Sequence, residues 1–265
     1  MTATLSLLLK MIQDNGDALH GTAYAVSTSY EVPQGHFARL CQSAILVGRA
    51  VTARRQMPLT LQVGADHIAG TAALADEILR FDGILAATAG GAWESGGKNS
   101  YHTLSPRFLN WSALFVLLDP YCCPVNVMPD EPGHLPVPEA KTGEEIALQK
   151  RSTDIVVAVV AKVHEAVRSI SEAAASSRGQ GGEIGQEVIQ QRLGALCPLV
   201  LDAVYCVMGL YCWLCQEGGG QSVKDRLADI ERFLSDVGER WGLAMEYLRL
   251  KKYHDDAGQL GMDGI

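Results

Sequence analysis

The stretch that decides the fold is VKDRLADIERFLSDVGERWGLAMEYL, residues 223–248. Its apolar residues alternate at intervals of four and three positions, which is the spacing of one helix face; they are Val223, Leu227, Ile230, Leu234, Val237, Trp241, Ala244 and Leu248. The pattern predicts one long helix with an inward apolar stripe, and it also fits a dimeric coiled coil. Gly238 and Gly242 weaken a free-standing zipper, which favours the packing helix of an α-helical bundle.

The segment before this stretch is more apolar still. Its uninterrupted run covers residues 203–215, which is shorter than the roughly 20 residues that a membrane-spanning helix needs. Pro198 and Asp202 interrupt any longer version. We therefore expect a helix that is buried by its neighbours, with no membrane span, and a turn at the three glycines of residues 218–220.

Helical spacing also dominates the first half of the chain. It predicts helices over residues 34–55, 66–87 and 104–118. The third is expected to end at Asp119-Pro120, because proline disfavours the helical conformation of the residue before it. On the first helix, the stripe expected to be buried is Phe37, Leu40, Ala44, Val47 and Val51.

A proline-rich connection is expected to divide the chain. Prolines recur between residues 120 and 138, and such a run cannot form a helix or a central strand. The next helix is expected to start at the N-cap candidates Ser152, Thr153 or Asp154 and to bury Val156, Val160, Val163, Val167 and Ile170. No strand pattern appears, so the prediction is an all-α multi-helix bundle: an N-terminal helical part (1–119), the connection (120–150), a C-terminal helical part (151–254) and a frayed tail (255–265).

Composition and charge exclude several classes of protein. The chain has 265 residues, 22 Lys and Arg against 30 Asp and Glu, a formal charge of −8 and 48% hydrophobic residues. These values are typical of a globular protein and too apolar for a disordered one. A negative balance opposes a surface that binds phosphates throughout. Arg49, Arg54 and Arg55 form the most compact basic cluster, which we interpret as a solvated helix end, so no direct nucleic-acid contact is predicted.

Cysteine usage indicates a reducing, intracellular compartment. The seven cysteines are an odd number in a long chain, whereas secreted disulfide frameworks are shorter and use even numbers. The first residues lack a basic leader and a small-residue cleavage site, so no signal peptide is expected.

The motifs of common enzymes and metal sites were sought without success. Gly97-Lys98 is followed by Asn99, which breaks a phosphate-binding loop, and neither a nucleophile elbow nor a His-Glu-x-x-His pair occurs. Cys212-x-x-Cys215 lies in an apolar run near a helix C-terminus, where a thiolate is not favoured. We therefore predict no enzyme, no cofactor and no metal site. Should a pocket inside the bundle carry catalysis, Tyr101, His102, Tyr205 and Cys206 are the first residues to test.

Residues 198–250 resemble the end of the regulatory (middle homology) region of fungal-specific Zn2Cys6-type transcription factors. Pro-x-x-x-Asp-x-x-Tyr matches Pro198, Asp202 and Tyr205, a glycine turn follows, and an Arg-Trp-x-x-Ala-x-x-Tyr-Leu ending matches Arg240, Trp241, Ala244, Tyr247 and Leu248. Residues 104–121 are similar to an apolar helix of that family, although Asp119-Pro120-Tyr121 departs from its His-Arg-Pro-Phe-like turn. Residues 37–51 also resemble a helix of the family, which ends here in Val47-Gly48-Arg49.

The resemblance implies a helical regulatory region that acts in the nucleus on transcription, in a metabolic or secondary-metabolite gene cluster. The family's six-cysteine zinc cluster has no counterpart in this sequence, so DNA recognition is not carried over. Partners would be proteins, such as a zinc-cluster transcription factor or a second copy of the chain. The residues expected to form the packing or partner interface are Leu227, Ile230, Leu234, Trp241 and Leu248. The alternatives are an all-α enzyme with a pocket in the bundle, or a scaffold unrelated to transcription, which would be cytoplasmic.

Overall fold

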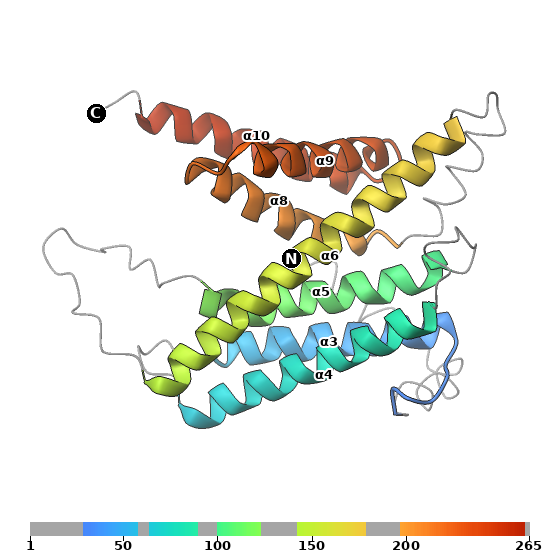
Figure 1. The fold of residues 1–265 in the computed structure, drawn as a ribbon, viewed down its shortest axis with the longest axis vertical. Helices are drawn as coiled ribbons and strands as arrows, with labels where there is room; N and C mark the ends of the chain where they lie inside the picture. Colours follow the sequence, from blue (N-terminus) through green and yellow to red (C-terminus); the bar gives the residue numbers. More distant parts are fainter. Residues whose placement is uncertain (1–28, 58–63, 90–99, 123–141, 179–196, 263–265) are drawn as a thin grey trace, which may run out of the picture.

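The computed structural model describes residues 29–57, 64–89, 100–122, 142–178 and 197–262. Within these ranges the chain forms helices and no strand: α3 (His36–Arg55), α4 (Ala65–Ala89), α5 (Ser100–Cys122), α6 (Gly143–Arg178), α8 (Val200–Gln216), α9 (Gln221–Gly238) and α10 (Gly242–Met262). The predicted all-α fold is confirmed (Figure 1). No helix in the described ranges is both long enough and apolar enough to cross a membrane.

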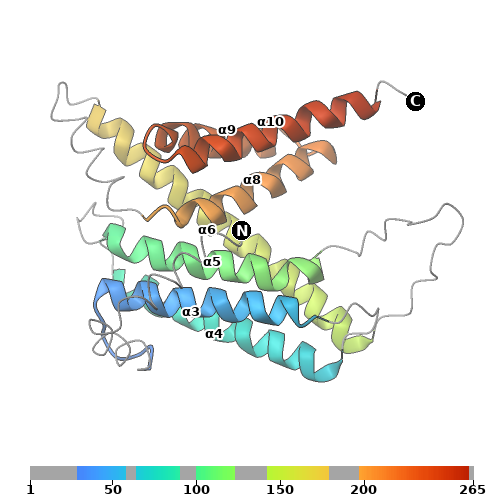
Figure 2. The ribbon, with the colours of Figure 1, turned by 180° about the vertical axis from the view of Figure 1, so that it is seen from behind.

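The helices form two layers, and α6 crosses both. Helices α3, α4 and α5 lie side by side in one layer, while α8, α9 and α10 form the other (Figures 1 and 2). Helix α6 runs diagonally between them and contacts α4 and α5 on one side and α8 and α9 on the other. Helix α5 packs against α3, α4, α6 and α8, so it is the central helix of the molecule.

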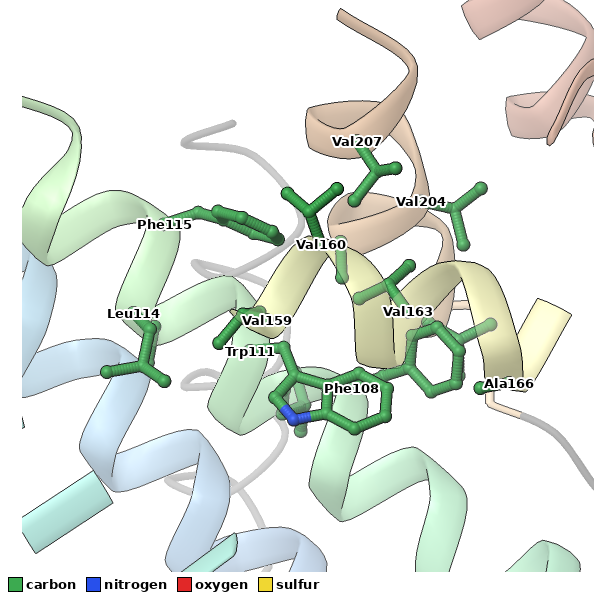
Figure 3. Close-up of a cluster of buried hydrophobic side chains, with 14 of the residues drawn as sticks. Phe108, Trp111, Leu114, Phe115, Val159, Val160, Val163, Ala166, Val204 and Val207 are labelled. Atoms are coloured by element: carbon green, nitrogen blue, oxygen red, sulfur yellow. The ribbon is translucent and has the colours of Figure 1, made fainter. Parts of the chain in front are cut away.

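The core common to both layers lies where α5, α6 and α8 meet. Aromatic side chains of α5 pack there against β-branched residues of the other two helices (Figure 3): Phe108, Trp111 and Phe115 with Val159, Val160, Val163, Val204 and Val207. The ring centroids of Phe108 and Trp111 are 4.9 Å apart, in an edge-to-face arrangement. Burial of each large side chain contributes roughly 1.5–3 kcal/mol, so this junction holds the two layers together.

The buried face of α3 differs from the predicted stripe. Phe37, the first residue of that stripe, is 60% exposed, although Val47 is buried. Arg39 and Gln42 are buried instead. Their side chains pair at 3.1 Å, and Arg39 also donates to the main-chain oxygen of Val32 at 3.1 Å. Apolar spacing could not indicate the burial of Arg39 and Gln42, because their hydrogen bonds allow it.

Helix α5 does not end at Asp119-Pro120 as predicted but continues to Cys122. Pro120 has no N–H to donate to the oxygen of Val116, four residues earlier. Arg54 of α3 donates to that oxygen at 3.4 Å and pairs with Asp119 at 2.8 Å. An arginine from the neighbouring helix thus satisfies the carbonyl that proline leaves without its helical partner.

Helix α6 begins before the predicted caps, at Gly143. The Thr142 hydroxyl accepts from the Glu145 N–H at 3.2 Å, and the Glu145 carboxylate accepts from the Thr142 N–H at 2.7 Å. This is a capping box, a Thr-x-x-Glu signal that the sequence carries. The predicted connection over 120–150 is therefore wrong at both ends, and residues 123–141 lie outside the described ranges.

The predicted long C-terminal helix is two helices. The main-chain N–H groups of Arg240 and Trp241 both donate to the Val237 oxygen, at 3.1 and 2.9 Å. Helix α9 ends at this turn. A Cβ at Gly238 would lie 2.5 Å from the Met245 sulfur, so the chain folds back where that glycine has no side chain. The tail is also helical where described, since α10 extends to Met262, and residues 263–265 lie outside the described ranges.

The turn predicted at the glycines is present between α8 and α9. Gly218 has φ of +85°, which favours glycine. Gly219 donates to the Leu214 oxygen at 2.8 Å, and a Cβ at this residue would lie 2.6 Å from that oxygen. Both glycines are therefore needed for the close approach of α9 to α8.

Candidate functional site at the junction of α5, α8 and α10

The residues expected to form an interface point into the molecule. Ile230 and Leu234 of α9 have no exposed surface. Leu227, Trp241 and Leu248 are partly buried and pack against the same core. Their stripe therefore holds α9 and α10 on the rest of the molecule, and a partner cannot reach Ile230 or Leu234 in this conformation.

Two of the four residues named for a possible pocket lie in a polar cluster. Tyr205 of α8 stacks on Tyr247 of α10, with ring centroids 4.2 Å apart and an interplanar angle of 24°. Cys206 is next to Tyr205 on α8 and packs against the core. Tyr101 and His102 fall on the first turn of α5, and their side chains lie outside the described part.

The centre of this cluster is Asp202, on the first turn of α8. Burial raises the pKa of Asp202, and the Ser112 hydroxyl of α5 acts in the opposite direction. Burial, followed by the charges of Asp202 and Asp119, raises the pKa of the Cys206 thiol to about 12. Burial, followed by Asp202 and Cys206, likewise raises the pKa of Tyr247 to about 12. We call Ser112, Asp202, Tyr205, Cys206 and Tyr247 the Asp202 cluster.

The direction of these shifts determines what the Asp202 cluster can do. A cysteine nucleophile needs a lowered pKa, and a thiol with a pKa of about 12 is protonated at neutral pH. The Tyr247 hydroxyl is also neutral there. Burial in this cluster therefore favours the neutral forms of its thiol and hydroxyl groups, which is the opposite of what activates a nucleophile.

A second polar contact joins α6 to the C-terminal layer. His164 and Glu165 are neighbours on α6 and make different contacts. The His164 Nε2 atom lies 3.4 Å from the Asp229 carboxylate of α9, and its ring meets Tyr211 of α8 edge-on at 6.1 Å. Glu165 pairs instead with Arg168, at 2.6 Å. This contact supports the position of α6 across the second layer.

A shallow hollow lies where the ends of α3, α4 and α5 meet. It measures about 160 Å³ when counted out to solvent, and Arg54, His67, Thr71 and Tyr121 provide its polar lining. The Thr71 and Tyr121 hydroxyls are 3.4 Å apart. Ligand pockets usually measure roughly 300–1,000 Å³, so this hollow is too small for such a ligand. No three His, Cys, Asp or Glu side chains of the described residues lie close enough together to hold a metal ion.

Three of the residues on which the resemblance was based lie close together in this structure. Asp202, Tyr205 and Tyr247 belong to the Asp202 cluster, and Ala244 is fully buried beside it. The contribution of Ser112 was missed, although a serine inside the apolar run of α5 is the signal that could have indicated it. No protein-family model, curated protein or solved structure matches the chain. What the chain does must therefore be inferred from its own residues.

Proposed function

We propose that this chain is the regulatory region of a transcription regulator, which acts in the nucleus through contacts with protein partners rather than through catalysis. The supporting observation is that Asp202, Tyr205 and Tyr247, three of the residues on which the resemblance rests, lie together where α8 meets α10. Residues that carry chemistry would converge on a pocket, whereas these three join helices. We further propose that the genes it controls form a metabolic or secondary-metabolite cluster.

The proposed mechanism is a change in helix packing that a partner can favour. A ligand or partner shifts a two-state equilibrium only by the difference between its affinities for the two states. The α8–α10 contact is suited to such a change, because few residues make it. A zinc-cluster partner would supply the DNA contact, and the present chain would regulate that partner.

The test is recovery of DNA with the full chain from nuclear extract. The tagged chain is expected to retain promoter DNA above a blank resin, because a DNA-binding partner comes with it. Tyr247→Ala removes the stack on Tyr205 and should reduce the DNA recovered. The matched control is Glu246→Ala, an exposed neighbour on α10, which should retain DNA as the unchanged chain does.

Two outcomes would contradict the proposal. DNA recovery equal to the blank, from an extract in which the tagged chain is folded, would show that no DNA-binding partner is held. Exclusion of the tagged chain from the nucleus would favour the scaffold alternative.

A further inference from the structure

The segment before α3 is attached to the first layer by one aromatic anchor. We call residues 29–35 the strap. The ring of Tyr30 stacks on Phe81 of α4, with centroids 4.4 Å apart at 25°. Its hydroxyl donates to the Glu77 carboxylate at 2.8 Å. Phe81 has no exposed surface, so Tyr30 covers a core residue of α4.

Charged side chains of α3 and α4 determine which group donates and which accepts the hydrogen bond of the Tyr30 hydroxyl. Arg49 of α3 donates to Glu77 at 2.7 Å, and this hydrogen bond lowers the pKa of Glu77. Burial and the hydrogen bond to Glu77 raise the pKa of Tyr30 to about 12. At neutral pH the tyrosine is therefore always the donor and the carboxylate always the acceptor.

The surface around the ring also recognises the residues after it. Arg80 lies over the Tyr30 ring, with Cζ 5.9 Å from its centroid, and its Nη1 atom is 3.7 Å from the Glu31 carboxylate. Arg39 is buried and donates to the Val32 main-chain oxygen at 3.1 Å. Arg39, Arg49, Glu77, Arg80 and Phe81 thus form a seat, the Tyr30 seat, which takes a tyrosine, the acid after it and the next main-chain oxygen.

Most of the strap is exposed to solvent. Ser29, Glu31, Val32 and Pro33 are exposed, and Tyr30 is only partly buried. The main-chain contact within the strap is a single turn, from the Val32 N–H to the Ser29 oxygen at 3.1 Å. Tyr30 is the one strap side chain that packs on the core, so the strap can leave without unfolding α3 or α4, and its departure would expose Phe81 and the Arg39 guanidinium.

We propose that the Tyr30 seat is a docking site for an extended segment of a partner protein, in which a tyrosine is followed by an acidic residue, and that the strap occupies this site in cis. The charges support this occupant: Glu77 accepts the hydroxyl, Arg80 faces the acid, and Arg39 binds the backbone. The proposal goes beyond the transcriptional role and does not rest on it, since the seat lies in the other layer from the Asp202 cluster.

The test is binding of a fluorescein-labelled peptide, SYEVPQG, to the full chain, measured by fluorescence polarisation. A tethered strap competes at an effective concentration in the millimolar range. Tyr30→Ala empties the seat, so we expect it to bind the peptide at least about tenfold more tightly than the unchanged chain does. In the Tyr30→Ala background, Glu77→Gln should weaken binding, whereas Asp76→Asn on the same helix should not.

A second variant keeps the test decisive if Tyr30→Ala is poorly folded. Glu31→Lys places a positive charge against Arg80 on an exposed residue, and it should loosen the strap and strengthen peptide binding. Equal peptide binding by the unchanged chain and a folded variant would overturn the proposal. Absence of saturable binding to either folded variant at millimolar peptide would also overturn it, and would leave the strap a structural contact only.

Discussion

Asp202 is a half-buried carboxyl group on the first turn of α8. Burial raises its pKa, so the folded protein holds this proton more tightly than the unfolded chain does. A group of this kind reduces the stability of the folded state as pH rises from the ordinary carboxyl range through the raised pKa. Below that range both states are protonated and the effect vanishes. Asp202, which lies in the α8–α10 contact, thus reduces the stability of the folded state as pH rises.

Asp202→Asn should remove this cost, because an amide does not ionise. We expect the melting temperature of the variant, relative to that of the unchanged chain, to increase as the pH is raised from 3.8, the ordinary pKa of Asp, towards neutrality. Asp154→Asn, on an exposed position of α6, is the control and should give a difference that does not change with pH. A pH-independent difference for Asp202→Asn, measured by circular dichroism melts, would contradict the assignment.

At the scale of the helices, the sequence predicted those features that apolar periodicity can detect. The stripes of α6 and α9 were predicted correctly, because Val163 and Ile230 are buried for their apolar character alone. The continuation of α5 through Pro120 was not, because it depends on Arg54, which is remote in sequence. The Asp202 cluster was found only in part, since Tyr205 and Tyr247 come from different helices and the spacing within each helix does not show that their rings meet.

The turn between α8 and α9 gives a prediction for a single helix junction. A Cβ at Gly219 would lie 2.6 Å from the Leu214 oxygen, and backbone cannot move as easily as a flexible side chain. Gly219→Ala should therefore reduce the free energy of unfolding by about 1–3 kcal/mol. Gly209→Ala is the matched change, in the exposed middle of α8 with nothing within 4 Å, and should raise it by roughly 0.5–1 kcal/mol. Urea unfolding distinguishes them, and equal effects would contradict the close approach.

Three helices meet at Asp82, which gives a prediction for their connection. Its carboxylate, 2% exposed, accepts from Arg107 of α5 at 3.0 Å and from Lys162 of α6 at 2.9 Å. Asp82→Asn leaves both cations without their anion, so we expect a loss of about 1.5–3 kcal/mol in chemical denaturation. Asp76 pairs with Arg151 on the exposed side of α4, and Asp76→Asn should cost at most about 1 kcal/mol. A loss for Asp82→Asn no larger than this would show that the buried contact does not join the helices.

At the scale of the whole molecule, the two layers are not independent units. The residues that join them, such as Phe115 of α5 and Val207 of α8, are buried in one continuous core. The helical parts predicted on either side of residues 120–150, as parts of one domain, share this core. Domains that share a core usually unfold together.

This shared core predicts a single unfolding transition. Trp111 lies on α5 at the junction of the two layers (Figure 3) and Trp241 lies in the second layer, so they report on different parts of the molecule once the other tryptophans are replaced by phenylalanine. The overall stability of each single-tryptophan variant is measured by circular dichroism. Within each variant, we expect the urea midpoint from tryptophan fluorescence to equal the urea midpoint from circular dichroism. Distinct midpoints within one variant, between its tryptophan signal and its helix signal, would show that the layers unfold separately.

Helix α6 has a mechanical consequence. Its 36 residues span about 54 Å, and its two halves rest on different layers. An unbroken helix of that length behaves as a stiff lever, because its hydrogen bonds resist bending. A tilt of roughly 5° about one end would sweep the other through roughly 5 Å. A displacement of one layer would therefore move the other layer through the backbone of α6. No series of side-chain rearrangements between the layers is required.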